Sequence, residues 1–271
     1  MHEMGEQPKV VILCGGMGAR LREETEFKPK PMVEIGDRPI LWHIMKSYAH
    51  YGYQDFVLCL GYKKEFIKDY FLNYEIMNND CTVQLGSPHA MKIHGKHSED
   101  GWTVTLADTG QAAMTGARIK RIEKYIDGDD FFVTYGDGVA DIRMDELLTF
   151  HKGHGKIATV TGVCPPSRFG ELIEVDNRVV EFREKPILPK AHINGGFFVF
   201  SRRVFDYLSP QDSCVLEGDP LERLSKDGEL LMYSHNGYWQ CMDTYRDRQA
   251  LNETWHNRSA PWKVWNHESS G

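Results

Sequence analysis

The chain has 271 residues, of which 41% are hydrophobic and 26% are charged, a composition typical of a globular protein. Lysine and arginine total 32 against 39 aspartates and glutamates, so the formal charge is −7, and the absence of a basic block argues against a nucleic-acid partner. The first residues are polar and no apolar run approaches the ~18 residues of a membrane span, so we expect a cytoplasmic protein with no membrane partner.

The first half of the sequence alternates predicted strands with predicted helices. Apolar runs predict strands at 9–14, 55–60 and 131–135. Helical spacing of apolar residues predicts helices at 39–51, 63–74 and 144–151, the first with a proline at its start and a glycine after its end. Strands that alternate with helices are typical of a parallel sheet covered on both faces.

The second half has a different pattern. Strands are predicted in quick succession at 157–164, 171–175, 179–183 and 193–200, which indicates some antiparallel pairing. A helix at 245–256 follows, and the tail carries Trp255, Trp262 and Trp265, which we expect to dock on the body of the protein. The polar, aperiodic stretch 86–100 is predicted to be a loop or insertion. The fold class is therefore α/β, with a mixed, mostly parallel central sheet flanked by helices.

A glycine-rich loop directly follows the first predicted strand. Glycines allow a tight turn whose N–H groups point at one anion, and an arginine at the end of the loop adds a fork of donors for phosphate oxygens. A Walker loop is excluded because no Gly-Lys-Ser/Thr is present, and a dinucleotide fingerprint is disfavoured because Pro29 and Pro31 interrupt any helix after the loop. An isolated motif of this kind is more often a plain turn. Its residues are Leu13, Cys14, Gly15, Gly16, Met17, Gly18, Ala19 and Arg20.

Three charged side chains after this loop are candidates for phosphate and metal binding. Lys30 lies between prolines that hold the chain extended, so it can reach a phosphate or simply lie on a solvated connection. Asp137 follows the strand 131–135, at the edge where parallel sheets bind ligands, and Asp243 precedes the last helix. Carboxylates of this kind bind Mg²⁺, or cap helices. The two acids could share one metal only if the fold brings them together.

A second group lies in the half with antiparallel strands. Glu184 and Lys185 end a predicted strand before Pro186, and either line a cleft or form a surface ion pair. Asn194 is followed by two glycines, which indicate close approach of the backbone to a ligand or a bulge. The histidines show no spacing typical of a zinc site, and no serine or cysteine triad can be defended.

Taken in this order, the motifs resemble those of the sugar nucleotidyltransferases, from roughly residue 10 to residue 265. The resemblance is carried by KPKPMVEIG, PILWHIMK, MTGARIKR, FVTYGDGVAD, INGGFFVF and APWKVW. It implies a Rossmann-like (GT-A-like) nucleotidyltransferase fold in a single domain, 1–271. The nucleotide-binding half would cover about 8–140, the sugar-phosphate-binding half about 141–243, and a C-terminal helix and tail 244–271.

The resemblance also implies an activity and its partners. With Mg²⁺, CMP would be transferred from CTP to α-D-glucose 1-phosphate by in-line attack on the α-phosphorus, giving CDP-glucose for surface polysaccharide such as O-antigen, and pyrophosphate. A homo-oligomer, such as a hexamer, is implied as well. The alternatives are the same chemistry with UTP, dTTP or another sugar 1-phosphate, a nicotinamide-dependent oxidoreductase, and a catalytically silent nucleotide-binding regulator.

Residue by residue, the resemblance assigns catalytic roles to Arg20, Lys30 and Asp137, and metal binding to Asp137 and Asp243. Ala19 stands where the family usually has threonine, which removes one hydrogen-bond donor to phosphate. The nucleotide-binding residues would be Leu13, Cys14, Gly15, Gly16, Met17, Gly18, Ala19, Arg20, Lys30, Thr109, Gly110, Thr115, Gly116, Arg118 and Gly136, and the sugar-phosphate-binding residues Gly170, Glu184, Lys185 and Asn194.

Overall fold

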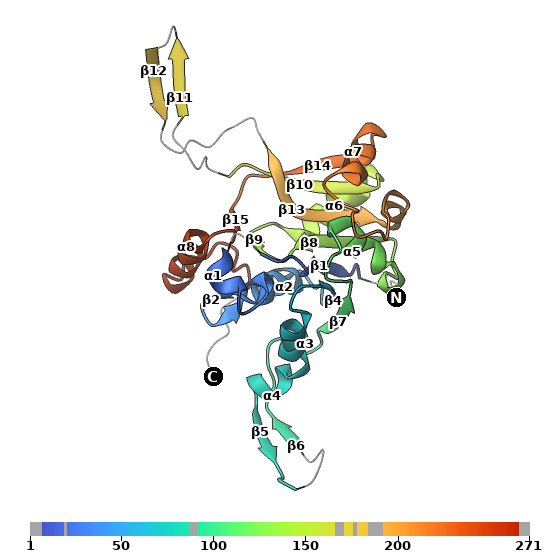
Figure 1. Cartoon of the computed structure of the whole chain (residues 1–271), viewed down its shortest axis with the longest axis vertical. Helices are drawn as coiled ribbons and strands as arrows, with labels where there is room; N and C mark the ends of the chain where they lie inside the picture. The colour runs from blue at the N-terminus through green and yellow to red at the C-terminus, as the bar shows by residue number, and fades with distance from the viewer. Residues whose placement is uncertain are drawn as a thin grey trace.

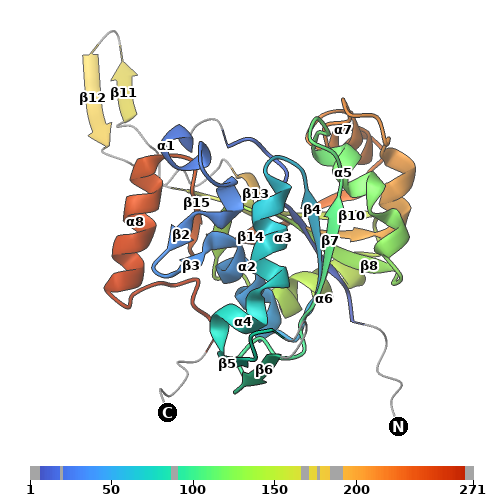
Figure 2. The same cartoon turned by 60° about the horizontal axis from the view of Figure 1, so that its bottom comes forward.

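The computed structural model describes residues 7–18, 21–86, 91–165, 171–175, 178–183 and 192–265. A seven-stranded sheet forms the centre of the molecule, and helices lie on both of its faces (Figures 1 and 2). Its strands follow the spatial order β14-β10-β13-β8-β1-β4-β7. The strands are β1 (Val10–Leu13), β4 (Asp55–Leu60), β7 (Thr103–Asp108), β8 (Asp130–Tyr135), β10 (Ala158–Val163), β13 (Ile193–Ser201) and β14 (Leu230–His235).

The pairing in this sheet is mixed and mostly parallel. β1 pairs in parallel with β4 and β8, β4 with β7, and β10 with β14. β13 is antiparallel to both of its neighbours, β8 and β10. The predicted α/β fold class is therefore confirmed. All four residues of β1 are buried, as expected of a parallel strand covered on both faces.

Successive residues of the central strands pack into cores on opposite faces of the sheet. Ile12 belongs to the core formed with α2 (Ile40–His50), α6 (Met144–His154) and α8 (Tyr245–His256). Val11 belongs to the core formed with α5 (Thr115–Arg121), the 3-10 helix η4 (Arg202–Tyr207) and α7 (Asp219–Lys226). The C-terminal tail docks on the first core, where Trp262 is fully buried and Trp255 makes an edge contact with the ring of His43.

Short elements join the ends of the central strands. After β1 come α1 (Arg22–Thr25), the 3-10 helix η2 (Lys30–Met32) and the hairpin of β2 (Glu34–Ile35) and β3 (Arg38–Pro39). The 3-10 helix η3 (Glu123–Tyr125) follows α5. β9 (Gly138–Ala140) pairs antiparallel with β15 (Trp239–Cys241), which brings two distant parts of the chain together beside β8. Among the helices that the structure describes, none combines the length and the apolarity needed to span a bilayer.

Two antiparallel hairpins project from the body (Figure 1). One is formed by β11 (Glu171–Val175) and β12 (Arg178–Arg183). The other, β5 (Asp80–Val83) with β6 (Met91–His94), follows α3 (Lys64–Leu72) and α4 (Tyr74–Asn78). Of the two alternatives predicted for 86–100, a loop or an insertion, the loop is wrong for residues 91–94, which form a strand of an inserted hairpin. That strand is too short to show a period, and it forms by pairing with β5.

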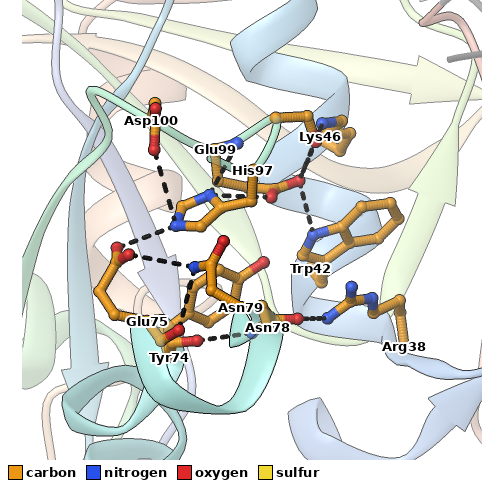
Figure 3. Close-up of polar contacts among 11 residues, drawn as sticks. Arg38, Trp42, Lys46, Tyr74, Glu75, Asn78, Asn79, His97, Glu99 and Asp100 are labelled. Carbon is orange, nitrogen blue, oxygen red and sulfur yellow. Dashed lines mark hydrogen bonds and ion pairs between the residues drawn. The ribbon is translucent and has the colours of Figure 1, made fainter. Parts of the chain in front are cut away.

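The base of the β5–β6 insertion is anchored to α2 by buried polar contacts (Figure 3). Glu99, which is 7% exposed, accepts hydrogen bonds from Trp42 Nε1 at 3.1 Å and Lys46 Nζ at 2.8 Å. His97 Nε2 lies 2.9 Å from Glu75 Oε1 on α4. Burial acts to raise the pKa of Glu99, but the hydrogen bonds that it accepts, that of Lys46 foremost, hold this pKa below its ordinary value. The carboxylate therefore stays charged and fixes the insertion to the body.

Candidate active site

Two cavities meet at the carboxyl ends of β1 and β8, the edge at which α/β sheets bind ligands. The larger, of about 340 Å³, is lined by the glycine loop, Lys30 and the start of α5. The smaller, of about 200 Å³, lies between β8, the start of β13 and the region of β15. Tyr135 and Asp137 line both cavities. Ligands in the two cavities would therefore touch the same two side chains.

The glycine loop is held at its base by the strands on either side of β1. Cys14 N donates to Cys59 O at 3.0 Å, and Gly136 N donates to Leu13 O at 3.1 Å. The side chain of Met17 is 66% exposed, and this residue is not among the described residues that line the larger cavity. The larger cavity is lined by these members of the set expected to bind nucleotide: Leu13, Cys14, Gly15, Gly16, Gly18, Lys30, Thr115, Arg118 and Gly136.

Arg118 is buried under this cavity and binds the loops around it. Its Nη1 donates to Leu60 O at 3.0 Å, to Thr109 Oγ1 at 2.8 Å and to Gly110 O at 2.8 Å. Its Nη2 donates to Gly15 O at 3.0 Å. Burial lowers the pKa of the guanidinium. Two residues expected to bind nucleotide, Thr109 and Gly110, are not among the described residues that line the larger cavity. They accept hydrogen bonds from Arg118 instead.

The start of α5 is covered by a segment from the second half of the chain. Ala117 N donates to Cys214 O at 3.1 Å, and Leu216 N donates to Thr115 Oγ1 at 2.9 Å. The Thr115 hydroxyl in turn donates to Glu217 Oε2 at 2.6 Å. Gly116, the remaining residue expected here, packs under Cys214.

Lys30, Asp137 and Asp243 form one cluster at the junction of the cavities. Lys30 Nζ donates to Asp137 Oδ2 and to Asp243 Oδ1, each at 2.6 Å, so the two carboxylate oxygens are at most twice that distance apart. The side chains of Lys30, Asp137 and Asp243 are 10%, 29% and 12% exposed. Burial acts against the ammonium, but the two carboxylates outweigh it and raise the pKa of Lys30. The lysine is therefore charged.

The strand pairing explains why these two acids meet. β15 pairs with β9, and Met242 N donates to Asp137 O at 2.8 Å. The cap of α8 is Thr244, in a capping box with Asp247, and the element after Asp137 is a strand. Helix capping, the alternative role considered for Asp137 and Asp243 from the sequence, is therefore filled by neither acid.

The smaller cavity contains Asn194 at the start of β13. Asn194 Nδ2 donates to the Tyr135 hydroxyl at 3.1 Å, and its Oδ1 accepts from Gly196 N at 2.8 Å. Trp239 Nε1 donates to Gly195 O at 2.7 Å. Gly196 has a φ of +78°, and a Cβ at this position would collide with the ring of Tyr135. Gly196 therefore allows close approach of an aromatic ring.

Five expected site residues cannot be placed. Ala19, Arg20, Gly170, Glu184 and Lys185 lie outside the described residues. Within the part of the chain that the structure describes, no group of three histidine, cysteine or acidic side chains could hold a metal ion. A cation at the junction would therefore need oxygen ligands from a substrate in addition to Asp137 and Asp243.

Sequence reasoning missed Tyr135 and Glu217, which meet at the boundary between the cavities. The Tyr135 hydroxyl donates to Glu217 Oε1. The position of Tyr135, at the end of β8 and two residues before Asp137, is a usable signal because ligand-binding residues gather there. Glu217 has no such signal, because it reaches the site from a loop before α7.

Comparisons with known proteins agree with this architecture. The family described as nucleotidyl transferase matches residues 9–247. A glucose-1-phosphate cytidylyltransferase of Salmonella typhi is 49% identical over 258 residues, covering 95% of this chain and 99% of that protein. The catalytic subunit beta of a mannose-1-phosphate guanylyltransferase of Dictyostelium discoideum is 30% identical, covering 88% and 62%. The solved inositol-1-phosphate CTP transferase of T. maritima has a TM-score of 0.64 at 17% identity, covering 97% and 99%, and supports the fold alone.

Proposed function

The chain belongs to the nucleotidyl transferase family, and we propose that it transfers CMP from CTP to α-D-glucose 1-phosphate, giving CDP-glucose and pyrophosphate. The observation that carries the proposal is the meeting of two cavities at Tyr135 and Asp137, with Lys30 reaching the same point. The larger cavity takes the nucleotide and the smaller takes the sugar phosphate. Two reactants held side by side in this way react as if in one molecule, which removes much of the entropic barrier.

In the proposed reaction an oxygen of the sugar phosphate attacks the α-phosphorus of CTP. The bond from this phosphorus to the oxygen that leads to the β-phosphate breaks, and pyrophosphate leaves with the electron pair. Lys30 lines the nucleotide cavity and carries a full charge, so it stabilises the negative charge that develops on the leaving group. Arg20 has the same role in the proposal.

We propose Mg²⁺ as the cofactor, held by Asp137 and Asp243. Their carboxylates are the hard oxygen ligands that Mg²⁺ prefers, and phosphate oxygens and water complete such a shell. Lys30 neutralises one of the two negative charges, so the cluster retains an excess negative charge that favours a cation. When bound, the ion neutralises phosphate charge and orients the reacting groups.

The sugar phosphate is proposed to bind at Asn194 in the smaller cavity, with Gly170, Glu184 and Lys185 completing its site. In this proposal Lys185 holds the attacking phosphate and Glu184 the sugar hydroxyls. Asn194 is fixed at both ends of its amide by Tyr135 and Gly196. Its orientation is therefore set before the sugar enters.

A pyrophosphate-release assay with glucose 1-phosphate and CTP, UTP, dTTP or ATP tests this function. We expect release with CTP, and faster release with UTP or dTTP would replace CTP as the substrate. Nucleotide binding without release would favour the silent regulator, and substrate-dependent oxidation of NAD(P)H would favour the oxidoreductase. Asp137→Asn should abolish release while the protein stays folded, because Lys30 keeps its ion pair with Asp243. Asp145→Asn, at a surface ion pair with Arg143, is the matched control.

We also propose that the protein forms a homo-oligomer such as a hexamer. The register of the β5–β6 hairpin places Cys81, Val83, Met91 and Ile93 on one face, and all four are exposed. An isolated two-stranded hairpin is marginally stable in water, and exposed apolar faces of this kind mark protein contacts. A second copy of the chain is the partner that we propose for this face.

A further inference from the structure

A chain of hydrogen bonds crosses the boundary between the two cavities. It starts at Thr115 on the nucleotide side, whose hydroxyl donates to one oxygen of Glu217 at 2.6 Å. The other oxygen of Glu217 accepts from the Tyr135 hydroxyl. That hydroxyl accepts from Asn194 Nδ2 at 3.1 Å on the sugar side. Thr115 and Asn194, which are both expected to contact substrate, are thus joined through Glu217 and through Tyr135, which lines both cavities.

The polarity of this chain is fixed by the tyrosine. The Tyr135 hydroxyl has one hydrogen, which it donates to the Glu217 carboxylate, so its oxygen lone pairs are left to accept from Asn194 Nδ2. The aromatic ring cannot retreat toward β13, because it lies directly over Gly196.

Both ends of the chain lie where substrates would bind. Met114 and Thr115 line the larger cavity, and the segment that carries Glu217 is tied to them, with Met114 N donating to Asp212 O at 2.9 Å. Asn194 lines the smaller cavity. A nucleotide in the larger cavity would therefore contact residues that are hydrogen-bonded to the segment of Glu217, which is linked through Tyr135 to the amide of Asn194.

We propose that Tyr135 and Glu217 are positioning residues that couple the nucleotide cavity to the sugar-phosphate cavity. The inference rests on the proposed function and adds to it that the sugar phosphate binds more tightly once the nucleotide is bound. Tyr135 orients the amide that meets the sugar. Glu217 sets the position of the Tyr135 hydroxyl. The position of Glu217 depends in turn on whether a nucleotide occupies the cavity beside Thr115.

The test uses Tyr135→Phe, Glu217→Ala and the double variant. Phenylalanine keeps the ring over Gly196 and removes the hydroxyl alone. Because Asn194 loses the neutral hydrogen bond that orients its amide, we expect the KM for glucose 1-phosphate to rise about 3- to 10-fold, with the KM for CTP within about twofold of the wild type. The double variant should be no worse than the worse single variant, because both break the same chain. Tyr207→Phe is the matched control, since its hydroxyl donates to Asp227 at 2.8 Å far from the site.

Calorimetric titration of glucose 1-phosphate, with and without a non-hydrolysable CTP analogue, measures the coupling directly. The analogue should tighten binding in the wild type and in Tyr207→Phe, and this effect should be lost in Tyr135→Phe. An unchanged KM and unchanged coupling in Tyr135→Phe would overturn this inference and leave the proposed function intact. Additive effects in the double variant would do the same. A wild-type protein without CTP-dependent turnover would overturn the proposed function and the inference together.

Discussion

Replacing Lys30 by methionine should destabilise the protein in a way that a divalent cation repairs. The substitution keeps the aliphatic stem and removes the ammonium that lies 2.6 Å from both Asp137 and Asp243. Removing one partner of a buried ion pair costs about 3–5 kcal/mol, and water reaches Asp137, which is 29% exposed, so we expect a value near the lower end. A loss of about 3 kcal/mol lowers the Tm by about 6–12 °C in a chain of this size.

The measurement is thermal unfolding in EDTA and in MgCl₂. The carboxylates raise the pKa of Lys30 above its ordinary 10.5, so its contribution to stability is complete at neutral pH and is lost as the pH rises through the raised value. Mg²⁺ should restore part of the Tm of Lys30→Met. It should change the Tm of the wild type little, because Lys30 already neutralises one of the two acids and no nucleotide is added to complete the shell of the ion. Pyrophosphate release should fall by about 100-fold or more.

Lys46→Met provides the matched control. Lys46 and Glu99 form an ion pair that is equally buried, with side chains 9% and 6% exposed, but it lies outside the proposed metal site. This variant should lose a similar amount of stability and gain none of it back from Mg²⁺. Two results would refute the interpretation of Lys30 as the counter-ion of both acids. One is a Lys30→Met protein that is as stable as the wild type in EDTA. The other is a Lys30→Met protein that Mg²⁺ stabilises no more than it stabilises Lys46→Met.

Three further predictions concern the core, the sugar side and the surface. Burial lowers the pKa of His43 to about 4, so the unfolded chain binds a proton at this residue before the folded protein does. The free energy of unfolding should therefore fall as the pH drops from about 6.5 to 4. In His43→Gln, urea titrations across this range should show a weaker dependence of the free energy of unfolding on pH. Gly196→Ala should lower both the Tm and pyrophosphate release, because a Cβ collides with the ring of Tyr135, whereas Gly155→Ala, at a similar φ of +65° with open space around it, should lower the Tm alone. Val83→Asp should reduce the mass measured by light scattering toward that of the monomer, and an unchanged mass would exclude this face of the hairpin from the assembly.

The sequence predicted the elements whose own residues show a clear hydrophobic pattern. α2 and α3 were placed from helical spacing, and β4 from a continuous apolar run. β7 was missed because it lies at the edge of the sheet and its residues alternate in polarity, so it lacks the continuous apolar run that identified the buried strands. α5 was missed because it is seven residues long and contains a glycine. The second strand of the insertion, β6, depends on a partner elsewhere in the chain, which local spacing does not reveal.

The same limit applies to the site. Lys30, Asp137 and Asp243 were each identified from local context, but their meeting depends on the pairing of β9 with β15. Glu217 carries no local signal. Arg118 was expected to bind nucleotide, and the structure shows its guanidinium hydrogen-bonded to the loops that surround the cavity. The roles of the residues outside the described part, and the division of the chain near residue 140, stay predictions.

The position of Arg118 has a consequence for how this protein can change in evolution. A Cβ at Gly15 or at Gly61, on two different loops, would collide with the same guanidinium. A side chain at either glycine would force the guanidinium out of its hydrogen bonds to these loops, and loss of the arginine would leave both loops without their common donor. We therefore expect the three positions to vary together among homologues, so that a lineage without the arginine is the place to look for alanine at both glycines.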